Sequence, residues 1–203
     1  MSAKRVAVLV SGGGTNLQAL INAQRRGESP SGKIELVVSN VEGAYALERA
    51  KKAGISARTI LRRAYSSQAE FEGAIIRALE EAQIDIIVLA GFLAILSESF
   101  TSRYPRRILN IHPSLIPSFC GEGFYGLKVH EAALQKGVKV SGATVHFVNE
   151  IPDGGEILLQ KAVAVRADDT PETLQKRIMR LAEWKLLPKA VEMACAEMKE
   201  RDS

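Results

Sequence analysis

The sequence has 203 residues, a formal net charge of +4 and a hydrophobic content of 46%, which suffice for one domain with a single core over residues 1–203. No apolar stretch is long enough to cross a bilayer, and the run from Val6 to Val10 is too short for a signal peptide, so we expect a cytoplasmic protein that binds no membrane. The basic residues are scattered among acidic ones, and this distribution favours a small anionic ligand over a nucleic acid.

The first predicted element is a strand that runs into a glycine-rich turn. Residues 5–10 read RVAVLV, a continuous apolar run typical of a strand buried on both faces. The sequence SGGGTN follows at residues 11–16, and a helical apolar pattern begins immediately after it. Backbone amides at such a turn bind phosphate, because glycine lets the anion approach closely. The turn fits neither the dinucleotide fingerprint nor the P-loop, so it indicates a single phosphate, with a plain tight turn as the alternative.

Strands and helices then alternate along the chain. Apolar runs predict strands at 33–39, 55–61 and 84–90, and helical periodicity predicts helices at 44–53 and from Ser66 or Ser67 to about residue 82. Strands that alternate with helices are joined by right-handed crossovers. The pattern therefore predicts an α/β fold with a Rossmann-like, doubly wound and mostly parallel sheet.

The stretch ILNIHPSLIP at residues 108–117 carries the strongest chemical signal. Asn110 and His112 are two residues apart, which puts both side chains on one face of a strand. Pro113 ends the regular pairing, so both side chains lie at the open end of that strand. An amide donor beside a titratable imidazole can stabilise an oxyanion and transfer a proton. The alternative is a capped strand with a hydrogen-bonded histidine.

Segment 91–96, GFLAIL, leaves the preceding strand at the carboxyl edge of the sheet, where open α/β folds bind ligands. Its uncharged backbone suits a flat heterocycle, with core packing as the alternative. This segment, the phosphate turn and the pair Asn110 and His112 are expected to share one crevice. Cys120 and Cys195 are far apart, and the sequence has no metal-ligand cluster or GxSxG elbow, so we expect no metal and no acyl-enzyme. The reaction type that these residues still allow is direct transfer of a group from a planar donor to a phosphate-bearing acceptor.

The second half of the chain predicts an antiparallel addition to the sheet. A loop at 118–126, rich in glycine and aromatic residues, is predicted to be mobile, and a helix at 127–135 ends near Gly137. Residues 138–148 alternate between apolar and polar side chains, and a hairpin-type connection leads to residues 156–165, so two antiparallel strands are predicted at the edge of the sheet.

One histidine and one aspartate in this half, His146 and Asp153, are open to more than one interpretation. His146 is predicted to be a buried structural histidine. Asp153 precedes two glycines, which is typical of a turn, and it gains a functional role only if its connection folds over His112.

A long C-terminal helix is predicted to begin near Pro171, with Pro188 as a candidate break before a charged tail.

Five motifs together resemble one enzyme family. SGGGTNLQAL, LAGFLAIL, NIHPSLIP, ATVHFV and DGGEILLQ occur in an order and spacing similar to those of phosphoribosylglycinamide formyltransferases, up to about Pro188. The resemblance implies an enzyme of de novo purine synthesis that transfers a formyl group from the co-substrate 10-formyltetrahydrofolate to the amine of glycinamide ribonucleotide by direct attack. We expect these two small molecules as its partners, no nucleic acid, no metal, and a monomer or a homodimer.

The same resemblance assigns the site residues. It implies a catalytic trio of Asn110, His112 and Asp153, in which the carboxylate of Asp153 keeps the imidazole of His112 protonated. The phosphate of the acceptor would bind at Gly14, Thr15 and Asn16, and Glu183 would also contact the acceptor. The folate would bind at Gln68, Leu93, Ala94, Ile95, Leu96 and Asn110.

The chain departs from the family pattern at several positions. Many members have arginine where this chain has Gln68 and Ala94, and the loop after Pro117 is longer by several residues. The helix before Glu183 carries one extra residue, and Trp184 replaces a common histidine. Within the same fold, the alternative is formyltetrahydrofolate deformylase, which has a similar Asn, His and Asp set and uses water as the acceptor. From a different class, the alternative is a non-catalytic nucleotide-binding module.

Overall fold

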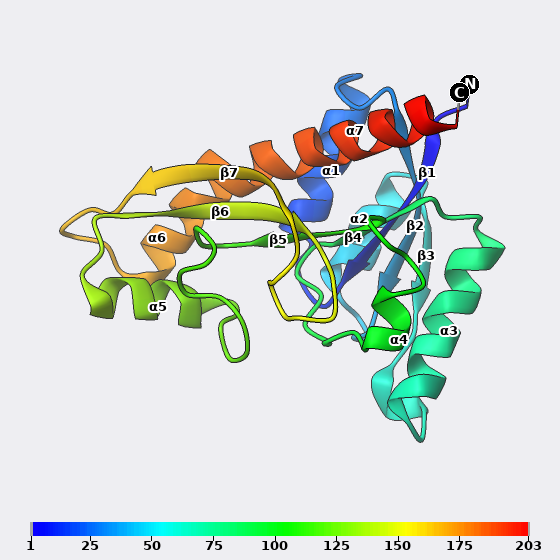
Figure 1. Ribbon diagram of the computed structural model, residues 1–203, viewed down its shortest axis with the longest axis horizontal. Helices are drawn as coiled ribbons and strands as arrows, with labels where there is room; N and C mark the ends of the chain where they lie inside the picture. The colour runs from blue at the N-terminus through cyan, green and yellow to red at the C-terminus, as the bar shows by residue number, and fades with distance from the viewer. Residues whose placement is uncertain (1, 203) are drawn as a thin grey trace.

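The computed structural model describes residues 2–202 and has one seven-stranded sheet at its centre (Figure 1). Its strand order is β3-β2-β1-β4-β5-β6-β7, with parallel pairing from β3 to β5 and antiparallel pairing of β6 and β7. The strands are β1 (Lys4–Val10), β2 (Gly32–Ser39), β3 (Ser56–Thr59), β4 (Ile86–Leu89), β5 (Ile108–His112), β6 (Val140–Phe147) and β7 (Ile157–Ala164). The predicted Rossmann-like, mostly parallel sheet with an antiparallel edge is confirmed.

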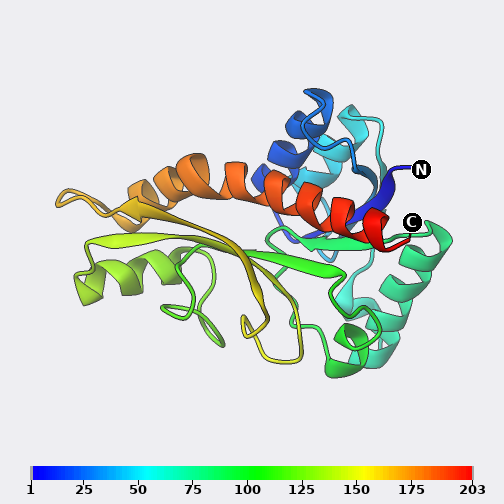
Figure 2. The same cartoon turned by 45° about the horizontal axis from the view of Figure 1, so that its top comes forward.

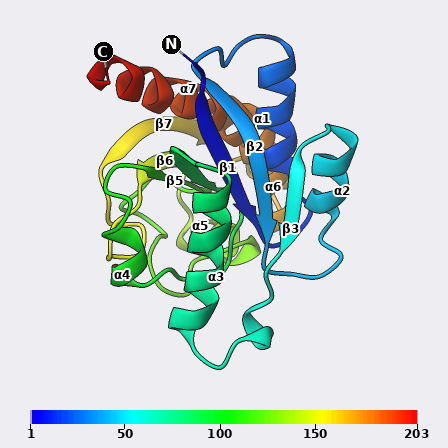
Figure 3. The same cartoon turned by 90° about the vertical axis from the view of Figure 1, so that its right-hand side faces the viewer.

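Helices cover both faces of this sheet (Figures 2 and 3). They are α1 (Thr15–Arg25), α2 (Tyr45–Lys52), α3 (Gln68–Glu81), α4 (Glu98–Thr101), α5 (Leu127–Lys136), α6 (Pro171–Ile178) and α7 (Trp184–Arg201), with a 3₁₀ turn η1 (Arg62–Ala64) and a π-helical turn η2 (Met179–Glu183). The sequence does not predict α4 or η1, because each is too short to carry a repeating apolar pattern.

Alternate side chains of the strands build the two halves of the core. On β1, Val6, Val8 and Val10 pack in one cluster with apolar residues of α1, α2 and α7. Ala7 and Leu9 face the other way and pack in a second cluster with apolar residues of α3 and α4. A strand that is buried on both faces has no polar side to display, which explains the continuous apolar run in the sequence.

The element boundaries follow local chemistry. Of the two serines predicted as caps of α3, Ser67 is the N-cap, and its hydroxyl accepts a hydrogen bond from the amide of Glu70. Gly137 adopts the left-handed conformation at the end of α5, as its position after the helix predicts. The strand predicted at 55–61 is shorter, because β3 is an exposed edge strand that pairs only with β2.

The predicted break at Pro188 is wrong. Helix α7 continues through Pro188 to Arg201, so the predicted charged tail forms the last turns of the helix. Proline removes one hydrogen bond and crowds the preceding turn, but Leu187, Pro188 and Val191 are buried, and their packing holds the helix together. Figure 1 shows α6, η2 and α7 as one helical path along a face of the sheet.

Candidate active site

Three loops meet at the carboxyl edge of the parallel strands. The glycine turn follows β1, segment 91–96 follows β4, and β5 ends at His112, on three neighbouring strands. The first two loops are hydrogen-bonded to each other. The amide of Ser11 donates to the carbonyl of Gly91 at 3.0 Å, and the hydroxyl of Ser11 accepts from the amide of Leu93 at 2.9 Å. The arrangement therefore creates a single site between them.

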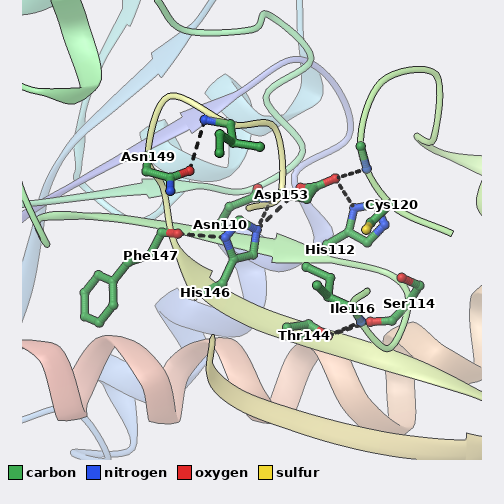
Figure 4. Close-up of polar contacts among 12 residues, drawn as sticks. Asn110, His112, Ser114, Ile116, Cys120, Thr144, His146, Phe147, Asn149 and Asp153 are labelled. Atoms are coloured by element: carbon green, nitrogen blue, oxygen red, sulfur yellow. Dashed lines mark hydrogen bonds and ion pairs between the residues drawn. The ribbon is translucent and has the colours of Figure 1, made fainter. Parts of the chain in front are cut away.

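Asp153 lies between Asn110 and His112 (Figure 4). Its Oδ1 accepts from Nδ2 of Asn110 at 3.3 Å, and its Oδ2 is 3.4 Å from Nδ1 of His112. His112 is buried, and its Nε2 is 2.8 Å from the carbonyl oxygen of Phe119. The site thus combines an amide donor, an imidazole and a carboxylate in direct contact.

The connection between β6 and β7 delivers Asp153 to this position. Asp153 has a φ of 55°, and the amide of Gly121 donates to its Oδ2 at 2.9 Å. Gly155 is required beside it, because a Cβ there would lie 1.8 Å from the carbonyl oxygen of Phe147. The connection therefore folds over His112. The sequence predicts a functional role for Asp153 only under this condition.

Burial works against the expectation that Asp153 keeps the imidazole of His112 protonated. Burial lowers the pKa of His112 below its ordinary value, and this outweighs the opposite effects of Asp153 and the Phe119 carbonyl. Burial alone would raise the pKa of Asp153, but the contacts with His146, His112 and the Gly121 amide hold it below its usual value. Burial therefore favours the neutral form of the imidazole, whereas the carboxylate beside it favours the charged form.

His146 is a residue of this site that the sequence analysis interprets only as structural. It is buried, and its Nδ1 lies 2.8 Å from the carbonyl oxygen of Phe147. Its Nε2, however, lies 3.1 Å from Nδ2 of Asn110 and 3.4 Å from Oδ1 of Asp153. Residues Asn110 and His146 are directly opposite each other on β5 and β6, so the antiparallel register brings them together.

A further histidine, His130 on α5, is completely buried, and neither of its ring nitrogens has a hydrogen-bond partner within residues 2–202. Burial, with a smaller effect of His112, lowers its pKa to about 4. The unfolded chain takes up this proton near pH 6.5, whereas the folded chain takes it up only near pH 4. This difference destabilises the fold progressively as the pH falls through that interval.

We expect His130 alone to lower the free energy of unfolding by about 3 kcal/mol between pH 7 and pH 4. The His130→Leu variant lacks the titrating group, so its stability should fall by that much less over the same interval. Urea unfolding of both proteins at pH 7, 5.5 and 4 measures the difference. Parallel curves for the two proteins would contradict the assignment.

The glycine turn is tied to the C-terminal helical segment. Asn16, in the first turn of α1, donates from Nδ2 to Oε2 of Glu183 at 2.7 Å, and both side chains are buried. Burial raises the pKa of Glu183 to about 7, although the bond from Asn16 opposes this. The Oδ1 atom of Asn16 is buried with no partner in the described residues. Asn16 therefore keeps one unsatisfied acceptor atom beside the glycine turn.

A groove of about 360 Å³ opens beside this turn. Its lining includes Thr15, Arg26, Arg49, Arg180 and Trp184, together with Gln18, Ala19, Asn22 and Lys185, and no acidic residue. The Nε of Arg49 donates to the carbonyl of Gly13 at 2.8 Å, which fixes this cation at the turn. The basic lining is not visible as a cluster in the sequence, because it comes from four elements: the end of α1, α2, η2 and α7. Its charge suits an anionic ligand.

Segment 91–96 forms an apolar wall on the other side of the site. Leu93 and Ile95 are 62% and 63% exposed, which is unusual for side chains of this kind, whereas Leu96 is buried. Ala94 lies between them and is half-buried. The side chain of Gln68 reaches this wall, and its Nε2 donates to the carbonyl of Ile95 at 2.8 Å.

Two further features concern residues 2–202 as a whole. No helix combines the length and apolar character that a membrane crossing requires. No group of three or more histidine, cysteine or acidic side chains has the arrangement of a metal site in the described part of the chain.

Known proteins are similar to this chain in sequence and in fold. The family model described as formyl transferase matches residues 4–191. The chain belongs to the formyl transferase family. Within that family, the phosphoribosylglycinamide formyltransferase of Haemophilus influenzae is 43% identical over 185 residues, which cover 91% of this chain and 84% of that protein.

Other members of the formyl transferase family extend the likeness. Glycinamide ribonucleotide transformylase 1 from Symbiobacterium toebii has a crystal structure that matches 97% of this chain and 89% of its own, with a TM-score of 0.90 and 40% identity. The human trifunctional purine biosynthetic protein adenosine-3 is 47% identical over 192 residues, and these cover 95% of this chain. This chain spans only 18% of the length of that human protein.

Proposed function

We propose that this chain, as one domain over residues 1–203, transfers the formyl group of 10-formyltetrahydrofolate to the amine of glycinamide ribonucleotide in purine synthesis. The observation that carries the proposal is the contact of Asp153 with Asn110 and His112, in a site between the glycine turn and segment 91–96. The names of the relatives from Haemophilus influenzae and Symbiobacterium toebii support the choice of acceptor.

The acceptor would bind at the glycine turn. Amides at the start of α1 would hold its phosphate at Gly14, Thr15 and Asn16, with the helix dipole and Arg49 adding positive potential. Glu183, which the bond from Asn16 holds beside the turn, would accept from the ribose hydroxyls or the amine. The acceptor amine would then point toward the catalytic residues.

The formyl donor would bind against segment 91–96. The exposed side chains of Leu93 and Ile95 fit the apolar face of a pteridine, and backbone groups of the segment would contact its polar edge. This placement brings the formyl group next to Asn110 at the end of β5. Asn110 therefore belongs to both the donor pocket and the catalytic trio.

The chemistry begins when the neutral amine attacks the formyl carbon. The new carbon–nitrogen bond puts negative charge on the formyl oxygen and positive charge on the amine. Asn110 donates from Nδ2 to that oxygen in place of its longer contact, the 3.3 Å bond to Asp153. One such donor contributes about 3 kcal/mol to stabilising the transition state.

His112 moves the proton. Its neutral imidazole takes a proton from the attacking nitrogen and returns it to the departing folate nitrogen as the old carbon–nitrogen bond breaks. Asp153 stabilises the imidazolium that forms between the two transfers. Nε2 of His112 is engaged by the Phe119 carbonyl here, so this step requires segment 118–126 to release it.

The decisive test is whether formyl release from 10-formyltetrahydrofolate depends on added glycinamide ribonucleotide. Release that requires the acceptor, with stoichiometric formation of the formylated product, supports the transferase. Equal release without acceptor would instead identify the deformylase, which the names of the matched relatives do not favour. No release under either condition would leave a nucleotide-binding module.

We expect Arg180→Ala to raise the acceptor KM about fivefold with little change in kcat. Arg180 lines the groove beside Thr15 and has no carboxylate partner in the described residues, so its charge is available to the acceptor phosphate. Steady-state kinetics with Lys176→Ala, an exposed cation of α6 outside the groove, gives the control. An unchanged acceptor KM in Arg180→Ala would contradict the prediction.

A further inference from the structure

Four residues connect helix α3 to the apolar wall of the site. Nε2 of Gln68 lies 2.9 Å from Oε1 of Glu72 and 2.8 Å from the carbonyl oxygen of Ile95. Glu72 in turn accepts from the amide of Ser97 at 2.7 Å and from the Ser97 hydroxyl. We call this set, formed by Gln68, Glu72, Ile95 and Ser97, the α3 clamp.

The chemistry of the partners fixes the orientation of the Gln68 amide. Both partners are acceptors, a carboxylate oxygen and a carbonyl oxygen, so the NH₂ group must face them. Each of its two hydrogens then has one partner. The atom of Gln68 left for a ligand is Oε1, which only accepts hydrogen bonds.

The clamp also compensates a buried charge. The side chain of Glu72 is 3% exposed, and in the described residues its hydrogen bonds come from neutral donors on Gln68 and Ser97. Removing the Gln68 donor would leave a buried carboxylate with fewer hydrogen bonds. That loss falls on the C-terminal end of the wall, because Ile95 and Ser97 are two residues apart in the same loop.

The glutamate tail of a folate carries carboxylates, which need hydrogen-bond donors or cations. Gln68 offers neither, and Ala94 has no polar group. The cations that precede α3 are engaged elsewhere, since Arg62 donates to the Tyr65 carbonyl at 3.1 Å and Arg63 pairs with Glu42 at 2.8 Å. The polar side chains at this end of the site are therefore engaged in contacts within the protein itself.

We propose that Gln68 is a positioning residue, which holds segment 91–97 in place through the α3 clamp and does not bind the folate tail. It follows that the chain recognises its donor through the pteridine end, and that the length of the glutamate tail has little effect on affinity. This inference rests on the proposed function for its ligand, but the clamp itself is a property of the unliganded protein.

Hydrogen exchange tests the clamp without any substrate. We expect the backbone amides of residues 92–97 to exchange about tenfold faster in Gln68→Ala and in Gln68→Glu, which puts a second carboxylate beside Glu72. Gln68→Arg restores donors to both partners and should exchange nearly as slowly as the wild type. The matched control is Gln135→Ala, an exposed glutamine on α5. Unchanged exchange in both Gln68→Ala and Gln68→Glu would overturn the clamp.

Kinetics with three formyl donors tests the role of Gln68. The donors carry no glutamate, one glutamate or several glutamates on the same 10-formyltetrahydropteroyl group. A positioning role predicts that Gln68→Ala raises the KM of all three by the same factor, about tenfold, with kcat within about twofold.

The outcomes separate the possible failures. A KM increase confined to donors that carry glutamate would show that Gln68 binds the tail and would overturn the inference. A wild-type protein that transfers no formyl group would overturn the proposed function, while the exchange experiment would still decide whether the clamp exists.

Discussion

Replacing Asp153 by asparagine should lower kcat by about 10²- to 10³-fold, and replacing His112 by alanine should lower it at least as much. The first change removes the carboxylate 3.4 Å from the imidazole, so the imidazolium formed during proton transfer loses its counter-charge. The second removes the proton carrier itself. Neither residue lies at the glycine turn, so the acceptor KM should change by less than about threefold.

The pH profile gives an independent measure of the same contact. Asp153 opposes the effect of burial on His112, so its replacement should lower the pKa of that imidazole further. The acid limb of kcat/KM, which lies below the ordinary histidine value of about 6.5, should therefore move to lower pH in Asp153→Asn. Asp168→Asn, an exposed acid in the connection to α6, is the control. Turnover close to that of the wild type in both Asp153→Asn and His112→Ala would remove the two residues from the mechanism.

Gly14→Ala is expected to raise the acceptor KM by more than about tenfold while the donor KM stays nearly constant. Gly14 has a φ of 69°, and a Cβ there would lie 2.6 Å from Cβ of Ala46 and 2.9 Å from its Cα. The turn must therefore move away from α2, and its amides then no longer converge on one point. A phosphate held by those amides would lose most of its hydrogen bonds.

Gly13→Ala provides a matched control for this change. A Cβ at Gly13 has no neighbour within 4 Å, and its φ lies outside the left-handed region, so the turn keeps its shape. Initial rates measured over a range of each substrate separate the two KM values. If Gly14→Ala weakened both substrates equally, the glycine turn would not be the phosphate site.

Local patterns were sufficient to predict most of the fold. The apolar runs of β1, β2 and β4 mark strands buried on both faces, and glycine or serine marks the ends of several helices. These signals are local because they depend on the neighbours along the chain. The break predicted at Pro188 is wrong because burial of α7 against the rest of the fold is a tertiary effect.

The site was predicted less completely, for the same reason. The position of Asn110 and His112 at the end of one strand follows from their spacing and from Pro113. The presence of His146 beside Asn110 depends on the register of β5 and β6, and the lowered pKa of His112 depends on burial. A local sequence motif predicts neither register nor burial. Arg180 reaches the groove from a different part of the chain, so its neighbours in sequence give no indication of its role.

The π-helical turn η2 preserves the rotational phase of the C-terminal helix. In an uninterrupted α-helix, one inserted residue rotates everything beyond it by about 100°, which would turn Leu187 and Val191 away from the core. A single wide turn accommodates the extra residue locally, as π-bulges do. With this wide turn in place, Leu187 and Val191 of α7 are buried and Glu183 keeps its bond from Asn16. Deleting one residue within η2 should convert the wide turn into regular α-helix and should be tolerated. An insertion one turn later should not be tolerated, because it would rotate the residues beyond it away from the core.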